Sequence, residues 1–318
     1  MQYTNLYNGD LMPSIGLGTW KSSQQTVTDA VNHALQTGYQ HIDCAPIYMN
    51  EKNVGHALEA SLQKKVIRRD ALWVTSKLWN SFHAPENVAK ALKETLHYLR
   101  LDYLDAYLIH WPVATKFSCH YRHAQSSSDY IPLADLPLED TWQAMIECQK
   151  AGLTRHIGVS NFSINKITQL INNTGISPSI NQVECHPYLN QNPLRQFCQQ
   201  QQIALTAYAP LGSADRPQIF KAADEPSLLE HPKILEIATQ HQATAAQVLI
   251  QWSLAKGNVV IPKSTHPERI EQNLAAAAMT LSSDTILQID QLNIDYRFIK
   301  GDFFTINGSP YTVESLWC

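Results

Sequence analysis

The stretches ALWVTSKL, residues 71–78, and YLDAYLIH, residues 103–110, determine the predicted fold. Both are short, apolar and rich in β-branched and aromatic residues, a composition typical of buried strands. Between them lies an apolar stripe at helical spacing, formed by Val88, Leu92, Leu96 and Leu99. A helix with such a stripe covers one face of a sheet. Residues 71–110 are therefore predicted to form a strand, a helix and a second, parallel strand.

The same alternation of strand and helix extends in both directions along the chain. Further helical stripes lie within residues 27–35 and 246–254. The predicted strands are residues 14–19, 39–43, 71–78, 103–110, 156–160, 180–184, 204–209 and 258–261. This alternation predicts an α/β protein with a parallel sheet, and eight strands are the number at which such a sheet closes into a filled (β/α)8 TIM barrel. An open doubly wound sheet is the alternative.

An N-terminal hairpin and long loops complete the predicted architecture. The pair Asn8-Gly9 is typical of a tight β-turn and predicts a β-hairpin before the first barrel strand. The longest predicted loop spans residues 113–138, and an aromatic-rich tail begins at Tyr296. We expect these extended segments to lie over the C-terminal face of the barrel. Because α/β barrels of this length form one domain, residues 1–318 are predicted to be a single domain.

The composition excludes several classes of protein. With 44% apolar residues, 16% charged residues and a net charge of -4, the chain is too apolar for disorder. It offers no broad positive field for nucleic acid or an anionic membrane. Its first residues do not resemble a secretory signal, and no apolar run is long enough to span a bilayer. The six cysteines are scattered without a CxxC pair, which indicates reduced thiols. We expect a cytoplasmic protein without nucleic-acid or membrane partners, of open oligomeric state.

Chemistry-bearing side chains gather at or just beyond the ends of the predicted strands. In (β/α)8 enzymes, the free loops at the C-terminal ends of the strands carry the active site. These side chains are Thr19, Trp20, Asp43, Lys77, His110, Ser160, Asn161, Gln182, Tyr208, Lys263 and Ser264. Neither a GxGxxG turn after a strand nor a P-loop occurs, so a bound nucleotide has to be held without either of these phosphate loops.

Three stretches carry a resemblance to a known family. They are GYQHIDCAPIYMNE, residues 38–51, with Val54-Gly55; IGVSNF, residues 157–162; and IPKS, residues 261–264, with Arg269, Gln272 and Asn273. Together they resemble the aldo-keto reductase superfamily, and the resemblance covers essentially the whole chain. It implies a (β/α)8 barrel that reduces carbonyl groups with NADPH. It also implies that Asp43, Tyr48, Lys77 and His110 occupy the four catalytic positions.

Elementary acid–base chemistry supports these four roles. A free tyrosine, with a pKa of about 10, is a poor proton donor at neutral pH, and a nearby ammonium lowers that pKa. We expect Lys77 to supply this charge and Asp43 to hold Lys77. In the implied mechanism, hydride from the nicotinamide C4 reaches the carbonyl carbon while Tyr48 protonates the oxygen and His110 positions it. A histidine at residue 110, where a family variant has glutamate, favours reduction of carbonyls over carbon–carbon double bonds.

The resemblance further implies the residues that hold the nicotinamide half of NADPH. Ser160, Asn161 and Gln182 match residues that hydrogen bond the carboxamide, and Tyr208 matches the residue that stacks on the ring. Leu211, Ser213 and Asp215 resemble a loop over the pyrophosphate, in which Asp215 reaches Lys263.

The adenosine end of the implied cofactor site is positively charged. Lys263, Ser264 and Arg269 match a cluster around the 2'-phosphate, and two cations with a hydroxyl suit a phosphate dianion better than a ribose hydroxyl. NADPH is therefore expected to be preferred over NADH. The cofactor set is completed by Thr19, Trp20, Asp43, Thr265, Gln272 and Asn273.

An aromatic pocket is expected for a small carbonyl substrate. Its predicted members are Trp20, Tyr48, Trp79, His110, Trp111 and Phe303, with Phe304 and Trp317 as further tail aromatics. Cys119, His120 and His123 lie close together in the sequence but lack a distant pair of ligands, so no metal site is expected.

Departures from the family pattern affect specificity more than chemistry. Gln40, Pro46 and Met49 differ near the first motif, and Gln272 differs near the adenine. Two other functions stay open. One is a catalytically weak cofactor-binding or structural protein of the same fold. The other is a barrel lyase or isomerase whose Lys263 and Arg269 bind a sugar phosphate. The physiological carbonyl is not identified by the sequence.

Overall fold

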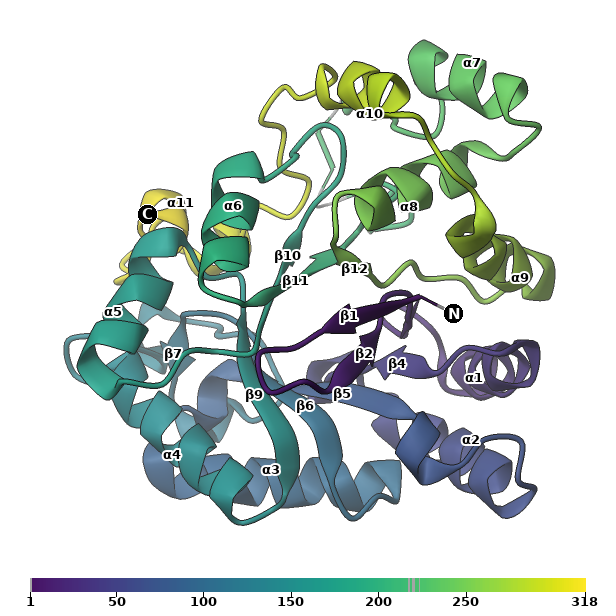
Figure 1. Cartoon of the computed structure of the whole chain (residues 1–318). Coiled ribbons are helices and arrows are strands. Elements are labelled where there is room, and N and C mark those ends of the chain that lie inside the picture. The colour runs from purple at the N-terminus through teal and green to yellow at the C-terminus, as the bar shows by residue number, and fades with distance from the viewer. Residues whose placement is uncertain (1, 217, 219–220, 223) are drawn as a thin grey trace.

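Eight parallel strands form one continuous sheet at the centre of the molecule (Figure 1). The computed structural model describes residues 2–216, 218, 221–222 and 224–318. In sheet order the strands are β3 (Leu17–Gly18), β4 (His41–Asp43), β5 (Trp73–Leu78), β6 (Leu104–Ile109), β9 (Thr154–Ser160), β10 (Ile180–Glu184), β11 (Ala204–Tyr208) and β12 (Val259–Val260).

Backbone hydrogen bonds join the two outer strands of this sheet. The Val260 N–H donates to the Ser14 carbonyl over 2.8 Å, and the Gly16 N–H donates to the Val260 carbonyl over 2.8 Å. Ile15 and Val260 form a parallel bridge. The sheet therefore closes into the predicted (β/α)8 barrel, and the alternative of an open doubly wound sheet is wrong.

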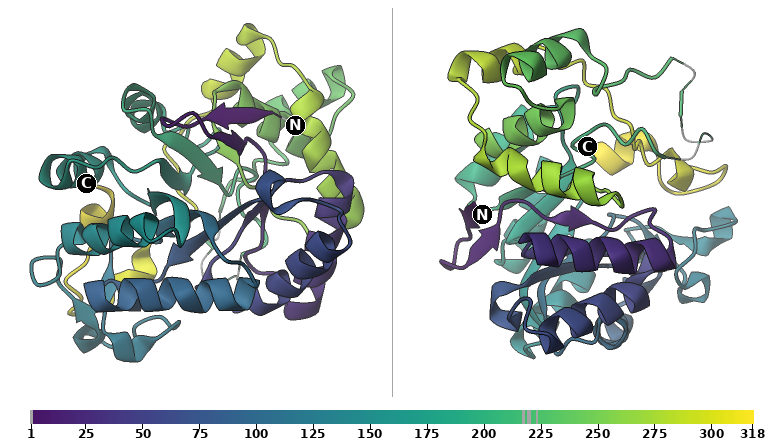
Figure 2. Two further views of the ribbon diagram at one scale, coloured as in Figure 1. Left: turned by 60° about the horizontal axis from the view of Figure 1, so that its bottom comes forward. Right: turned by 90° about the vertical axis from the view of Figure 1, so that its right-hand side faces the viewer.

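Helices follow the strands and surround the barrel (Figures 1 and 2). They are α1 (Gln24–Thr37), α2 (Glu51–Gln63), α3 (Pro85–Leu99), α4 (Leu138–Lys150), α5 (Ile164–Thr174), α6 (Asn192–Gln200), α7 (Pro232–Gln240), α8 (Ala245–Ala255), α9 (Pro267–Ala275), α10 (Ser283–Asp290) and α11 (Val313–Trp317). All four residues of the stripe that predicted α3 are buried. Gly55 allows α2 to lie against α3, because a Cβ at this position would be 2.1 Å from the Tyr98 carbonyl oxygen.

The predicted N-terminal hairpin lies across one end of the barrel (Figure 1). It consists of β1 (Tyr3–Asn5) and β2 (Leu11–Pro13), which pair antiparallel. Gly9 adopts a φ of +88° in the turn, a conformation that costs glycine little. Leu6 and Met12 are buried in one cluster with inward-facing barrel residues such as Trp73. Because this hairpin covers the N-terminal end, a site in the barrel has to open at the C-terminal end.

The segment between β6 and α4 contains more structure than the loop predicted for residues 113–138. Two short strands, β7 (Ala114–Thr115) and β8 (Tyr130–Ile131), pair antiparallel within it. Tyr311, from the C-terminal tail, accepts the Ala114 N–H over 2.9 Å and donates to the Ile131 carbonyl over 2.6 Å. The loop and the tail therefore hold each other in place, an interaction across almost 200 residues that no local sequence pattern records.

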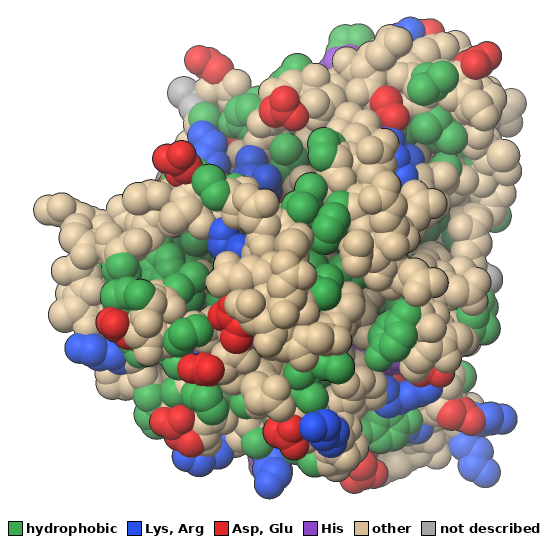
Figure 3. Space-filling model, turned by 60° about the vertical axis from the view of Figure 1, so that its left-hand side comes forward, with side chains coloured by type: hydrophobic (Ala, Val, Ile, Leu, Met, Phe, Trp, Pro, Cys, Tyr) green, Lys and Arg blue, Asp and Glu red, His purple; other side chains and the backbone are tan. Residues whose placement is uncertain are grey.

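Acidic and basic side chains are interspersed on the face shown in Figure 3. Within the described ranges, no helix is long and apolar enough to cross a bilayer. The same ranges hold no cluster of three or more His, Cys, Asp or Glu side chains arranged for a metal ion.

Candidate active site

Asp43, Tyr48, Lys77 and His110 come together at the C-terminal ends of three neighbouring strands. Asp43 ends β4, Lys77 lies near the end of β5, and His110 directly follows β6. Tyr48 ends a short 3-10 helix that begins at Pro46, whose fixed φ suits the first turn of a helix. Because β4, β5 and β6 are parallel and adjacent, their ends meet at one edge of the barrel.

Lys77 is the centre of this group. Its ammonium donates to Asp43 Oδ1 over 2.6 Å, to the Cys44 carbonyl over 2.9 Å and to the Tyr48 hydroxyl over 3.4 Å. The Lys77 side chain has 0% exposure, and that of Asp43 has 3%. A charged pair buried this deeply interacts strongly and depends on both partners being present.

Burial controls the protonation of the tyrosine and the lysine. It raises the pKa of Tyr48 to about 12, and the Lys77 ammonium offsets only part of this rise. The expectation of a lowered Tyr48 pKa is therefore wrong for this structure, because the sequence does not show how completely the phenol is desolvated. Burial also opposes the charge on Lys77, but Asp43 outweighs it and the pKa of Lys77 is raised to about 12. At neutral pH, Tyr48 carries its proton and Lys77 is charged.

His110 is buried next to Tyr48 as a neutral imidazole. Burial, reinforced by the nearby Lys77 charge, holds its pKa well below the usual range. Its ring meets that of Tyr48 edge-on, with 6.0 Å between the ring centroids. A neutral imidazole has one N–H donor, so His110 suits the role of a hydrogen-bond donor better than that of a charged acid.

A second layer of hydrogen bonds fixes these groups from β9, β10 and β11. Gln182 donates to Asp43 Oδ2 over 2.7 Å. Asn161 accepts the Tyr208 hydroxyl over 2.8 Å and donates to the His110 carbonyl over 2.9 Å. These bonds hold Asn161 at a φ of +65°, which is uncommon for a residue with a Cβ. These bonds link the C-terminal ends of β4, β6, β9, β10 and β11.

One large cavity is lined by three of the four catalytic candidates and by the residues expected to bind the cofactor. Its volume is about 1170 Å³. Residues expected from the sequence that line it are Thr19, Trp20, Asp43, Tyr48, Trp79, His110, Trp111, Ser160, Asn161, Gln182, Tyr208, Leu211, Ser213, Asp215, Lys263, Ser264, Thr265, Arg269, Gln272, Asn273 and Phe303. Lys77 is absent from this wall because it lies behind Asp43 and Tyr48. It can therefore act on a ligand only through those two residues.

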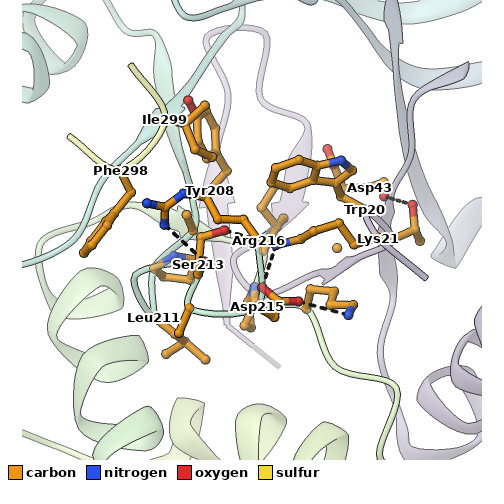
Figure 4. Close-up of a pocket in the computed structure, with 18 of the residues that line it drawn as sticks. Trp20, Lys21, Asp43, Tyr208, Leu211, Ser213, Asp215, Arg216, Phe298 and Ile299 are labelled. Carbon is orange, nitrogen blue, oxygen red and sulfur yellow. Dashed lines mark hydrogen bonds and ion pairs between the residues drawn. The ribbon is translucent and has the colours of Figure 1, made fainter. Parts of the chain in front are cut away.

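Two lysines contact Asp215, which lines the cavity; Figure 4 shows its contact with Lys21. Lys263 lies 3.2 Å from Asp215 Oδ2, the contact expected from the sequence. Lys21 lies 2.5 Å from Asp215 Oδ1, donates to Ser213 Oγ over 3.1 Å and stacks its ammonium over Trp20 at 4.2 Å. Lys21 was not predicted as a site residue. It directly follows Trp20, which was expected just beyond the end of a strand, and this position could have indicated it.

The opposite end of the cavity is aromatic. Trp79 meets His110 edge-on, with ring centroids 5.3 Å apart, and Trp111 meets Phe303 at 5.7 Å. Two of the tail aromatics, Phe304 and Trp317, do not line the cavity and instead pack against Trp111. His123 also lines the wall, although the sequence analysis considered it only as a possible metal ligand. The cavity is thus polar and cationic at one end and aromatic at the other, with Tyr48 and His110 where the two meet.

These features define a class: a (β/α)8 barrel with a buried Tyr-Lys-Asp group at the C-terminal strand ends, facing a cavity large enough for more than one small molecule. A family model described as the aldo/keto reductase family matches residues 14–294. The chain belongs to the aldo/keto reductase family, and it is accordingly an oxidoreductase.

Relatives and solved structures agree with this membership over almost the full length of the chain. An aldo/keto reductase of Synechocystis sp. is 49% identical over 317 residues, covering 100% of this chain and 96% of the relative. Aldo-keto reductase family 1 member A1 of Gallus gallus is 42% identical, covering 97% of this chain and 93% of the relative. The aldose reductase of Schistosoma japonicum superposes with a TM-score of 0.87 at 37% identity, covering 96% of both chains. An aldo-keto reductase of Bombyx mori in complex with NADP also gives 0.87, at 34% identity, covering 96% of this chain and 97% of that one.

Proposed function

We propose that this protein reduces aldehyde or ketone carbonyls to alcohols with NADPH, and that Tyr48 is the general acid. The observation that carries the proposal is the contact of Lys77 with both Asp43 and Tyr48 behind the cavity wall. Burial keeps the phenol protonated at neutral pH, and the Lys77 contact places a fixed positive charge beside the phenolate that forms when the proton leaves.

The residues of the cavity fit NADPH. Ligand sites of about 300–1,000 Å³ hold a single drug-sized molecule, so a cavity of about 1170 Å³ has room for a dinucleotide beside a small substrate. Gln182 donates its amide nitrogen to Asp43 and keeps its amide oxygen to accept from a carboxamide. At the other end, no carboxylate in the described ranges lies within 4.0 Å of Arg269, which leaves its guanidinium available for the 2'-phosphate.

In the proposed reaction, bound NADPH supplies the hydride that the carbonyl carbon takes up. Tyr48 transfers its proton to the carbonyl oxygen, and the ammonium of Lys77 stabilises the resulting phenolate. Asp43 holds that ammonium in position. His110, neutral and buried, donates a hydrogen bond to the carbonyl oxygen and so orients the carbonyl toward both donors. Carbonyl, hydride and proton together give the alcohol.

The test is loss of NADPH absorbance on a panel of aromatic, short aliphatic, sugar and dicarbonyl substrates. We expect turnover on several of them, and Tyr48→Phe should lower kcat by at least about 10²-fold, the usual contribution of a general acid. NADPH binding without turnover on any substrate would instead support the non-catalytic alternative. Activity on phosphorylated sugars without any nicotinamide would support the lyase or isomerase alternative.

The proposed preference for NADPH over NADH has a separate test. Lys263→Ala and Arg269→Ala remove the two cations of the proposed 2'-phosphate site. We expect each to weaken NADPH binding, measured by fluorescence titration, while NADH binding changes little. Equal losses for the two cofactors would contradict the assignment of this cluster to the phosphate.

A further inference from the structure

His123 is an imidazole set among three aromatic rings at the aromatic end of the cavity. Its ring meets that of Trp79 at 85° with centroids 5.3 Å apart, and that of Phe303 at 82° with centroids 5.3 Å apart. The ring of Phe304 lies 6.0 Å away. His123 is thus the polar, hydrogen-bonding side chain that the long β6–α4 segment contributes to the cavity wall.

The chain on both sides of His123 is anchored. The indole N–H of Trp79 donates to the Arg122 carbonyl over 3.3 Å. The Tyr121 hydroxyl donates to Glu94 over 3.0 Å, and the Tyr121 ring stacks on Phe82 with centroids 4.8 Å apart. A side chain held by neighbours in this way is positioned before a ligand arrives, which lowers the entropic cost of a hydrogen bond to that ligand.

The ring nitrogens of His123 have no protein partner within the described residues. The backbone carbonyl of His123 accepts from Gln125, but the imidazole itself makes no hydrogen bond or ion pair there. His123 is exposed to solvent as a residue, but the surrounding rings partly desolvate the imidazole and lower its pKa, so the ring is neutral at pH 7. A neutral imidazole offers one donor and one acceptor, which matches a hydroxyl group, itself both donor and acceptor, better than a carboxylate.

Trp79 connects this imidazole to the reacting end of the cavity. Its ring contacts both His110 and His123, each with ring centroids 5.3 Å apart. Because all three line the same cavity, a substrate whose carbonyl lies at Tyr48 and His110 can extend along Trp79 and place its far end at His123. We propose that His123 determines specificity by hydrogen bonding a hydroxyl group at the end of the substrate remote from the carbonyl. This inference rests on the proposed carbonyl reduction.

The test uses three aldehydes of similar size that differ at one remote group: para-(hydroxymethyl)benzaldehyde, para-ethylbenzaldehyde and para-carboxybenzaldehyde. For each, kcat/KM is measured with NADPH for the wild type, His123→Phe and His123→Gln. A single net hydrogen bond changes kcat/KM by roughly fivefold. His123→Phe should therefore lower the hydroxymethyl-to-ethyl ratio of kcat/KM about fivefold. His123→Gln, which keeps donor and acceptor groups, should restore most of it.

His97→Phe is the matched control. His97 is an exposed histidine near the end of α3 and does not line the cavity, so the same chemical change there should leave the ratio unaltered. A ratio that stays constant in His123→Phe while the ethyl compound is still reduced would overturn the role of His123 and leave the proposed function intact. A selective loss of the carboxylate compound would also overturn it, in favour of an anion site. No reduction of any aldehyde by the wild type would instead refute the proposed function itself.

Discussion

Replacing Lys77 by methionine removes the charge at the centre of the site while keeping a side chain of similar length. Lys77 has 0% exposure, and its ammonium contacts Asp43 at 2.6 Å. Without it, the Asp43 carboxylate stays buried with Gln182 as its remaining side-chain partner in the described structure. Removing one partner of a buried ion pair typically costs about 3–5 kcal/mol of folding free energy. We expect a loss of this size in Lys77→Met.

Catalysis should fail for a second reason. Lys77 offsets part of the burial that raises the pKa of Tyr48 to about 12, so its removal raises that pKa further. The phenolate that forms on proton transfer also loses its neighbouring charge. We expect kcat for aldehyde reduction to fall by about 10²–10⁴-fold, the range associated with general acid catalysis.

The assay combines urea unfolding with single-turnover reduction, and the double variant Asp43→Asn, Lys77→Met supplies the decisive comparison. Removing both charges leaves neither unpaired, so the double variant should be more stable than the sum of the single losses implies, by about 2 kcal/mol or more. It should remain as inactive as Lys77→Met. Additive stability losses in this cycle would refute the reasoning, because the two charges would then not depend on each other.

Three further predictions concern residues outside this pair. Burial raises the pKa of Glu51 to about 7, so the folded state holds this proton more tightly than the unfolded state between about pH 4.5 and 7. The free energy of unfolding should fall by about 3 kcal/mol as pH rises through this window, and urea titrations should show that Glu51→Gln removes this dependence. Asp215→Asn weakens the contacts with Lys21 and Lys263, so stopped-flow measurements should show faster NADPH release; an unchanged rate would contradict the assigned role of the loop. Gly158→Ala places a Cβ 2.6 Å from a backbone carbonyl of β10, and the melting temperature should fall with a loss of about 1–3 kcal/mol; wild-type stability would show that the barrel wall adapts there.

Much of the architecture was predictable because barrel strands and helices have local signatures. The apolar runs at residues 71–78 and 103–110 and the stripe between them predicted β5, α3 and β6, and the structure confirms all three. The order of parallel strands then places Asp43, Lys77 and His110 at one edge. Asp43, Lys77 and His110 could be named from the chain because each lies at or directly after the end of such a strand, whereas Tyr48 and Arg269 were named through the family resemblance.

Other features depended on contacts between distant segments. The barrel closes through hydrogen bonds between residues 14–16 and Val260, and Tyr311 ties the tail to the β7–β8 strands. Lys21 meets Asp215 across 194 positions of sequence. Neither hydrophobic periodicity nor composition indicates such pairs, because the local sequence around each residue would look the same if its distant partner were absent.

The sequence by itself therefore determined the kind of fold, the residues gathered at the strand ends and the family they indicate. Only the tertiary structure decided the environment of those residues. Tyr48 has a raised pKa because surrounding segments desolvate it more than Lys77 compensates. His123 became a cavity residue because Trp79 and Glu94 anchor its loop over the barrel. Burial and distance are properties of the packed chain, and the chemistry of the site depends on both.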